Sequence, residues 1–142
     1  MRRVVLLCGP PGAGKTTAAY ASGLPVYDRD DERWCSEAGF RAALAQLASD
    51  PQARAVVIRS GASSSARAKA AGLVGATSVF MVIAPRDELM RRITMRARHD
   101  ARQTKAAVDT WFSRFDRDDG VLDFPGWEQA EAPDLGAVAS HW

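Results

Sequence analysis

The sequence predicts an α/β fold of three layers, with helices on both faces of a mostly parallel sheet. Three short, largely apolar segments, at residues 4–7, 55–58 and 77–84, have the length and composition of strands buried on both faces. Segments with helical spacing or helix-start signals lie between them, and this alternation is typical of βαβ units. A ligand of such a fold is expected at the carboxyl ends of the strands.

The expected helices are marked by local start and stop signals. Trp34 and four alanines recur at helical spacing, and Asp50-Pro51 would end that helix. Ser63 offers an N-cap, and Pro85 suits the first turn of a further helix. A short β-like pair at residues 26–27 precedes the first long helix. The expected helices lie at residues 15–21, 31–49, 63–71, 85–98 and 105–115.

The composition is that of one soluble domain. The chain has 142 residues, of which 46% are hydrophobic and 25% charged, and this predicts a single domain over residues 1–142. The apolar runs are too short to span a bilayer and no signal-peptide pattern is present, so we expect a cytoplasmic protein with no membrane partner. Cys8 ends an apolar run and is expected to be a buried hydrophobic residue.

The net charge of +2 is unevenly distributed along the chain. Residues 1–117 hold all 19 Lys and Arg, whereas residues 118–142 hold six acids and no Lys or Arg. A basic body suits polyphosphate or nucleic-acid ligands. The acidic C-terminal tail, residues 118–142, could fold over that body and screen an acceptor channel, or it could pack through Trp127 and Trp142 as ordinary structure.

A phosphate-binding loop follows the first apolar run. Residues 9–16, Gly-Pro-Pro-Gly-Ala-Gly-Lys-Thr, fit the pattern G-x-x-x-x-G-K-[ST] without departure. Glycines let the backbone fold around an anion so that successive N–H groups point inward. Lys15 is expected to neutralise phosphate charge, and the Thr16 hydroxyl to coordinate Mg²⁺. The expected ATP-binding residues are Gly9, Gly12, Ala13, Gly14, Lys15, Thr16 and Thr17.

The rest of the nucleotide site favours a small ATP-dependent kinase. No N-K-x-D segment that would read guanine is present, and the strand at residues 55–58 leads to Arg59-Ser60 instead of an Asp. A motor ATPase would need that acid, whereas small kinases often hold Mg²⁺ without it. These absences favour ATP and Mg²⁺ as the ligands of a P-loop kinase.

An acidic segment follows the short strand at residues 26–27. A kinase needs a base or orienting group for the acceptor hydroxyl beside the γ-phosphate. Asp28 and Asp30 precede the expected helix, in a place where their carboxylates can face the phosphate loop. Asp31 is equally consistent with an ordinary acidic helix start. We therefore expect Asp28 to contact the substrate and Asp30 to act on the hydroxyl.

The phosphate loop and the segment Arg29-Asp30-Asp31-Glu32-Arg33 together resemble the polynucleotide 5′-kinases, including the bacteriophage RNA-repair enzymes. In that family an R-D-D-x-R segment follows the loop at a similar distance. The resemblance implies that Asp30 is the general base on a nucleic-acid 5′-hydroxyl and that Arg33 contacts the acceptor's phosphate.

The segment at residues 88–96 resembles the lid helix of the same family. The resemblance implies that Arg92 and Arg96 grip the ATP phosphates and the transferring phosphoryl group. The spacing agrees, because residues four apart share one face of a helix. A surface ion pair between Glu88 and Arg92 is the competing interpretation. The expected architecture is thus a P-loop NTPase or kinase fold with a helical lid.

One departure from the family leaves the acceptor open. The phage enzymes carry Ser-Asp-Thr-Asn after the second long strand, and Ser60 stands here in place of that Asp. The leading interpretation is phosphorylation of a polynucleotide 5′-hydroxyl or a nucleotide-like acceptor. A kinase for a small acceptor, such as a nucleoside, a nucleoside monophosphate or a metabolite, is the second. A non-catalytic nucleotide-binding regulatory module is the third.

Four aromatic side chains have alternative roles. Trp111, Phe112 and Phe115 lie at helical spacing, which favours a place in the core over base stacking. Trp34 could stack on an acceptor base or close the core.

Overall fold

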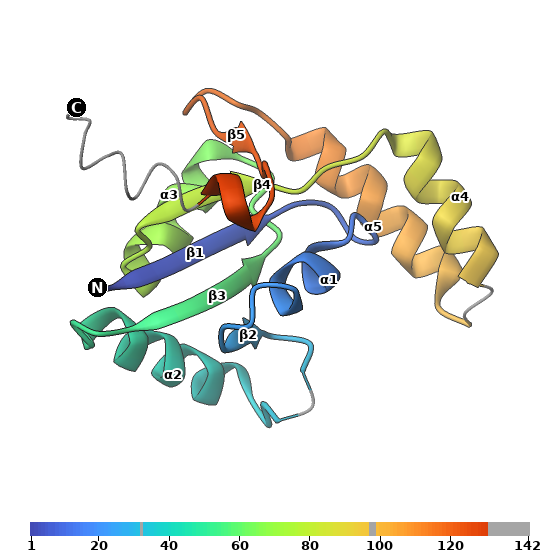
Figure 1. Cartoon of the computed structure of the whole chain (residues 1–142). Coiled ribbons are helices and arrows are strands. Elements are labelled where there is room, and N and C mark those ends of the chain that lie inside the picture. Colours follow the sequence, from blue (N-terminus) through green and yellow to red (C-terminus); the bar gives the residue numbers. More distant parts are fainter. Residues whose placement is uncertain (32, 97–98, 131–142) are drawn as a thin grey trace.

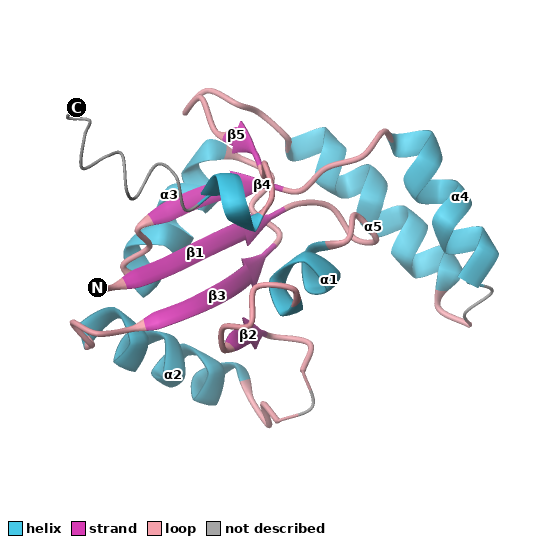
Figure 2. Ribbon diagram, viewed as in Figure 1, coloured by secondary structure: helices cyan, strands magenta, loops and turns pink. Residues whose placement is uncertain are grey.

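A five-stranded parallel sheet forms the centre of the molecule (Figures 1 and 2). The computed structural model describes residues 1–31, 33–96 and 99–130. The strand order is β2-β3-β1-β4-β5, and each neighbouring pair is parallel. This order and direction confirm the predicted α/β fold class. The strands are β1 (Arg3–Cys8), β2 (Val26–Asp28), β3 (Arg54–Arg59), β4 (Ser78–Met81) and β5 (Leu122–Asp123).

Helices cover both faces of the sheet, which gives the three expected layers. On one face, β-strand side chains pack with α2, α3 and α5 around Phe40, Leu44 and Trp111. On the other face, Ala19 of α1 and the segment 124–130 pack against Val5, Leu7 and their neighbours. The helices are α1 (Lys15–Tyr20), α2 (Glu37–Ser49), α3 (Ser64–Val74), α4 (Arg86–Arg96) and α5 (Ala101–Arg114).

A helical hairpin of α4 and α5 projects beyond the sheet, on the right in Figure 1. Leu89, Ile93 and Val108 form a small core of their own between the two helices. Ala13 of the phosphate loop packs against this core. The hairpin therefore stands beside the phosphate loop, as a lid helix would.

The second long helix begins later than the sequence predicts. It starts at Glu37 and not at Asp31, with Ser36 as N-cap, whose hydroxyl accepts from Gly39 N at 3.0 Å. Before it, the carboxylates of Asp28 and Asp31 each accept a backbone N–H two residues on. Such Asx turns compete with helical hydrogen bonding, so the acids hold a loop open.

One helix boundary in the last quarter of the chain also differs from the prediction. The polar stretch at residues 99–104 was expected to separate two helices, but α5 already begins at Ala101, where its polar residues face solvent. The tail contributes the edge strand β5, which pairs with β4 through Leu122 and Asp123 and was not predicted from the sequence. Trp127 donates to Ala18 O at 2.7 Å, so it packs the tail as ordinary structure. Glu131, Asp134 and Trp142 lie outside the described residues.

The aromatic side chains serve the core. Trp111 is 4% exposed and stacks on Phe115, with Phe112 against its edge. Trp34 packs between Tyr27 and Phe40. No helix among the described residues is long and apolar enough to cross a membrane.

The two cysteines should differ sharply in reactivity. Cys8 is fully buried, and its burial raises the pKa of the thiol to about 11, whereas Cys35 is exposed. Because the thiolate is the nucleophile, a maleimide at neutral pH should label Cys35 alone in the native protein. Mass spectrometry should find the second label only in denaturant. Rapid native labelling of Cys8 would contradict the packing of β1.

Candidate active site

A polar cleft of about 590 Å³ opens at the carboxyl ends of the central strands. Its volume lies within the range of small-molecule sites, about 300–1,000 Å³. Its walls come from the phosphate loop, the loop after β2, the end of β3 and the lid hairpin. The polar side chains that line it include Lys15, Thr16, Asp28, Asp30, Arg59, Ser60 and Arg96.

Three glycines of the phosphate loop occupy positions that other residues cannot take without strain. A Cβ at Gly9 would lie 2.0 Å from Val82 O, so the loop can leave β1 only without a side chain there. Gly14 caps α1 with φ 101°, in the left-handed region that glycine tolerates. Gly12, at φ 81°, has the same requirement. Of the other expected ATP-binding residues, Ala13 lies in the loop, where its N–H donates to Pro10 O, and Thr17 lies in the first turn of α1.

The Lys15 side chain curls back along the phosphate loop. Its Nζ donates to Gly9 O at 2.5 Å and approaches Pro10 O at 3.5 Å. Burial of the ammonium lowers its pKa, while Asp28 and Asp30 act in the opposite direction. An ammonium has three N–H donors, so one remains for a phosphate oxygen. The positive charge thus lies where the phosphate-loop motif requires it.

Thr16 and Asp28 bring two oxygen atoms together at the start of α1. The Thr16 hydroxyl donates to Asp28 Oδ2 at 3.2 Å. A hydroxyl and a carboxylate are hard oxygen donors, which is the chemistry that Mg²⁺ prefers alongside phosphate oxygens and water. These two residues therefore fit a magnesium ion, and Asp28 joins Thr16 as a candidate ligand.

Asp30 follows Asp28 on the same wall of the cleft and is exposed to it. Its backbone N–H donates to Asp28 Oδ1 at 3.1 Å, which fixes the spacing of the two acids. Arg29, between them, is occupied by an ion pair to Glu37 at 2.9 Å. Asp30 can thus present its carboxylate to a hydroxyl in the cleft.

The Arg33 side chain does not line the cleft. Its guanidinium donates to Val26 O and lies 4.6 Å from the Trp34 ring centroid, over that aromatic cluster. Among the described residues that line the cleft, Arg33 does not occur. The acceptor contact that the resemblance implies for Arg33 would require the side chain to leave both of these contacts.

The two lid arginines are placed differently. Arg96 lines the cleft opposite the phosphate loop. Arg92 donates to Gly12 O at 3.1 Å and also forms an ion pair with Glu88. Arg92 thus fastens the lid helix to the phosphate loop while keeping its charge beside that loop. The competing ion pair with Glu88 is present, and the phosphate contact expected of Arg92 stays a prediction.

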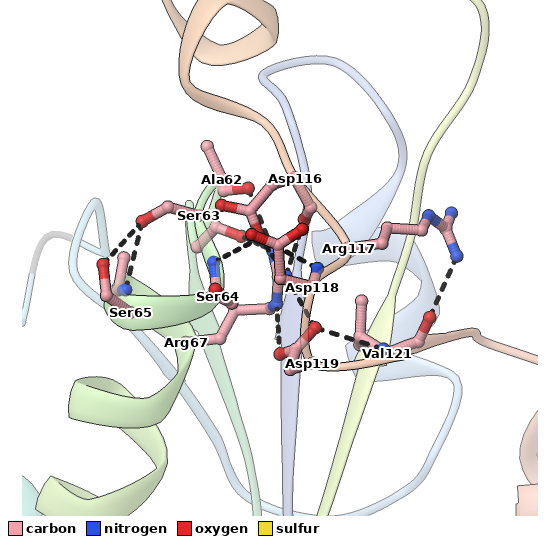
Figure 3. Close-up of polar contacts among 12 residues, drawn as sticks. Ala62, Ser63, Ser64, Ser65, Arg67, Asp116, Arg117, Asp118, Asp119 and Val121 are labelled. Atoms are coloured by element: carbon pink, nitrogen blue, oxygen red, sulfur yellow. Dashed lines mark hydrogen bonds and ion pairs between the residues drawn. The ribbon is translucent and has the colours of Figure 1, made fainter.

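Arg59 and Arg67 are two charged residues that sequence reasoning missed. Arg59 lies at the end of β3 and lines the cleft. Arg67, on α3, is 1% exposed and uses all five N–H donors. It donates to both carboxylate oxygens of Asp119 and to three backbone carbonyls, those of Gly61, Ala62 and Asp116 (Figure 3). Its place seven residues after Ser60 carries no pattern that would reveal this role.

The contacts of Arg67 hold the cleft wall in position. They tie the loop after β3 to the segment before β5, as Figure 3 shows. Ser60 begins that loop, and its carbonyl accepts from Gly9 N and from Trp111 Nε1. The tail residue Asp119 is therefore part of the framework behind the phosphate loop. Asp123 similarly pairs with Arg117, so these tail acids do not screen the cleft.

Removing the Arg67 side chain should destabilise the fold strongly. Arg67→Met leaves the buried Gly61 carbonyl without its observed donor, removes one of the two donors to the Ala62 carbonyl and breaks the pair with Asp119, at a cost of about 3 kcal/mol. Denaturant unfolding measures this change. Arg114→Met, on the exposed end of α5, is the matched control and should change stability by less than about 0.5 kcal/mol. Equal stabilities of the two variants would contradict the observed network.

Solved structures with similar folds include three kinases of small molecules. A gluconokinase from Sinorhizobium meliloti 1021 has a TM-score of 0.60 at 16% identity, covering 87% of this chain and 82% of its own. A sugar kinase from Janibacter sp. HTCC2649 has a TM-score of 0.62 at 15% identity, and the match covers 96% of this chain and 94% of that one. A shikimate kinase from Acinetobacter baumannii, in complex with shikimate, has a TM-score of 0.53 at 17% identity, and the match covers 99% of this chain and 95% of that one.

These similarities establish the fold, which is that of P-loop kinases with the strand order 2-3-1-4-5. The sequence itself matches no protein-family model, and no curated protein is significantly similar to it. The expected polynucleotide acceptor gains no support from the three kinases, whose names state small molecules.

Proposed function

We propose that this protein is an ATP-dependent kinase that transfers the γ-phosphate to a hydroxyl group of a small acceptor. The observation that carries the proposal is one cleft that holds Lys15 and Thr16 on one wall and Asp28 and Asp30 on another. A phosphate-binding loop that faces a free carboxylate supplies both halves of phosphoryl transfer to a hydroxyl.

Each side chain of the cleft has its own part in the transfer. Lys15 and the loop N–H groups hold the β- and γ-phosphates, and Thr16 with Asp28 holds Mg²⁺, which when bound neutralises phosphate charge. Asp30 accepts the proton of the acceptor hydroxyl while the hydroxyl oxygen bonds to the γ-phosphorus. The bond from that phosphorus to the β–γ bridging oxygen breaks, and ADP leaves. Arg96, across the cleft, offsets the charge on the transferring group.

The placement of Arg33 favours a small acceptor over a polynucleotide. That side chain was the residue expected to grip an acceptor phosphate, and it is engaged with Val26 O and the Trp34 ring outside the cleft. The folds of the gluconokinase and the shikimate kinase add weight to the same choice. A polynucleotide 5′-hydroxyl remains the second candidate, because Asp30 and Arg96 line the cleft as that resemblance implies.

The test is acceptor-stimulated release of ADP from Mg·ATP. The panel contains gluconate, shikimate, glucose, nucleosides, nucleoside monophosphates and 5′-hydroxyl oligonucleotides, with water alone as the background. Stimulation by one of the small hydroxyl compounds is the expected result. Stimulation by oligonucleotides alone, with a steep loss as salt rises, would replace the proposal by the polynucleotide interpretation. ATP binding with no stimulation by any acceptor would favour a regulatory module.

A further inference from the structure

Arg59 occupies a central place among the strand ends. Because β3 lies between β2 and β1 in the sheet, its last residue stands between the loop with Asp28 and the phosphate loop. In the pairing of β1 with β3, Cys8 lies opposite Arg59, and in the pairing of β2 with β3, Asp28 lies opposite Ile58. Arg59 is half-buried and lines the cleft. A molecule whose hydroxyl meets Asp30 in front of Lys15 must therefore pass close to Arg59.

The guanidinium of Arg59 faces Glu37 only through space, whereas Arg29 and Arg92 near this cleft are held in ion pairs. Arg29 is paired with Glu37, and Glu37 also pairs with Arg41 at 3.0 Å. Arg92 is bound to Glu88 and Gly12 O. The structure gives Arg59 no hydrogen bond or ion pair with any residue it describes, and the observed contact of its guanidinium is with the Phe40 ring, 5.6 Å from the centroid.

The contact with Phe40 prepares Arg59 to bind an anion. A guanidinium against an aromatic ring is held by cation–π attraction, and its N–H donors point outward in its own plane. That fork matches the two oxygens of a carboxylate or the oxygens of a phosphate. Phe40 is itself fully buried, so the ring is a fixed support.

We propose that Arg59 determines acceptor specificity by binding an anionic group, a carboxylate or a phosphate, on the small acceptor. This inference rests on the proposed kinase function and names its substrate class. The neighbouring Ser60 carries no charge of its own, so the charge recognition at this strand end falls to Arg59. In the proposed mechanism Lys15, the loop N–H groups and Arg96 bind the phosphates of ATP instead.

The experiment compares charged acceptors with their neutral counterparts. Gluconate is paired with sorbitol to test a carboxylate, and a nucleoside 3′-monophosphate is paired with its nucleoside to test a phosphate. Arg59→Gln should raise the KM of the anionic member of the effective pair by about 10- to 100-fold, as expected for hydrogen bonds to a charged group. The KM of ATP and the turnover of the neutral member should stay unchanged.

Two further variants keep the test independent of folding. Arg54→Gln changes an exposed arginine at the opposite end of β3, so it should leave every constant unchanged. Arg59→Lys keeps the charge without the planar fork and should give an intermediate KM. Equal losses with anionic and neutral acceptors in Arg59→Gln, or a raised KM for ATP alone, would overturn the proposal.

Calorimetry with a nonhydrolysable ATP analogue distinguishes this proposal from the kinase function. If the same pairs bind with a preference for the anion that Arg59→Gln abolishes, but no transfer occurs, the role of Arg59 stands and the kinase function fails. If transfer occurs without any preference for the anion, the kinase function stands and the role of Arg59 fails.

Discussion

Replacing Lys15 by methionine should reduce phosphoryl transfer by at least about a hundredfold, in line with the loss of one fixed charge stabilising a transition state. Lys15 is the only basic residue within the phosphate loop itself, and its Nζ lies against the Gly9 and Pro10 carbonyls that shape the loop. Neither Arg92 nor Arg96 can take its place, because Arg92 is bound to Gly12 O and Glu88, and Arg96 lines the cleft from the lid side. Steady-state turnover with Mg·ATP and the best acceptor measures the effect.

The same substitution should not cost stability. Burial lowers the pKa of Lys15, which means that the folded state disfavours the protonated ammonium relative to the unfolded chain. Removing the charge removes that penalty, so thermal unfolding of Lys15→Met should occur at the same temperature or higher. Lys69→Met, on the exposed side of α3, is the control and should alter neither quantity. Unchanged turnover in Lys15→Met would contradict the assigned phosphate site.

Replacing Asp30 by asparagine should lower kcat by about 10²- to 10⁴-fold, the range for loss of a general base. The amide keeps the shape of the side chain but cannot accept the hydroxyl proton. The KM of ATP should change little, because the proposed nucleotide contacts are those of the phosphate loop, Thr16 and Asp28, which the substitution leaves in place. Such a fall in kcat with intact ATP affinity indicates an interaction made in the transition state.

Asp31→Asn is the matched control for this substitution. Asp31 adjoins Asp30, but its carboxylate accepts the Arg33 backbone N–H and shapes the local turn. Its kcat should therefore stay within about threefold of the wild type, since surface changes of this kind are usually small. Equal losses in the two variants would show that the loop matters only through its shape. A wild-type kcat in Asp30→Asn would contradict the role of Asp30 as the general base.

The fold and the phosphate site could be predicted because their signals are local. The buried strands appear as apolar runs, and the glycines of the phosphate loop occupy positions that a Cβ or a negative φ would disrupt. The motif also fixes the places of Lys15 and Thr16, since only a few backbone arrangements surround a phosphate. Asp28 and Asp30 follow from the rule that parallel strands end at one edge of the sheet.

The missed features depend on contacts between distant parts of the chain. Arg67 meets Asp119 across 52 residues, and β5 is a strand of two residues that forms only because β4 offers an edge. The direction of Arg33 is decided by a carbonyl and two rings, which an R-D-D-x-R pattern does not encode. Arg59 is similarly inconspicuous in sequence, and strand order alone gives it a central position.

Single-turnover transfer from γ-labelled ATP tests the proposed kinase activity most directly. The wild-type protein, in excess over Mg·ATP, is mixed with the small-acceptor panel, and the label is followed into acceptor and inorganic phosphate. The proposed mechanism predicts label on the hydroxyl of one small acceptor, with none in Lys15→Met and far slower transfer in Asp30→Asn. Label that stays on ATP, or that appears only as inorganic phosphate with every acceptor, would contradict it.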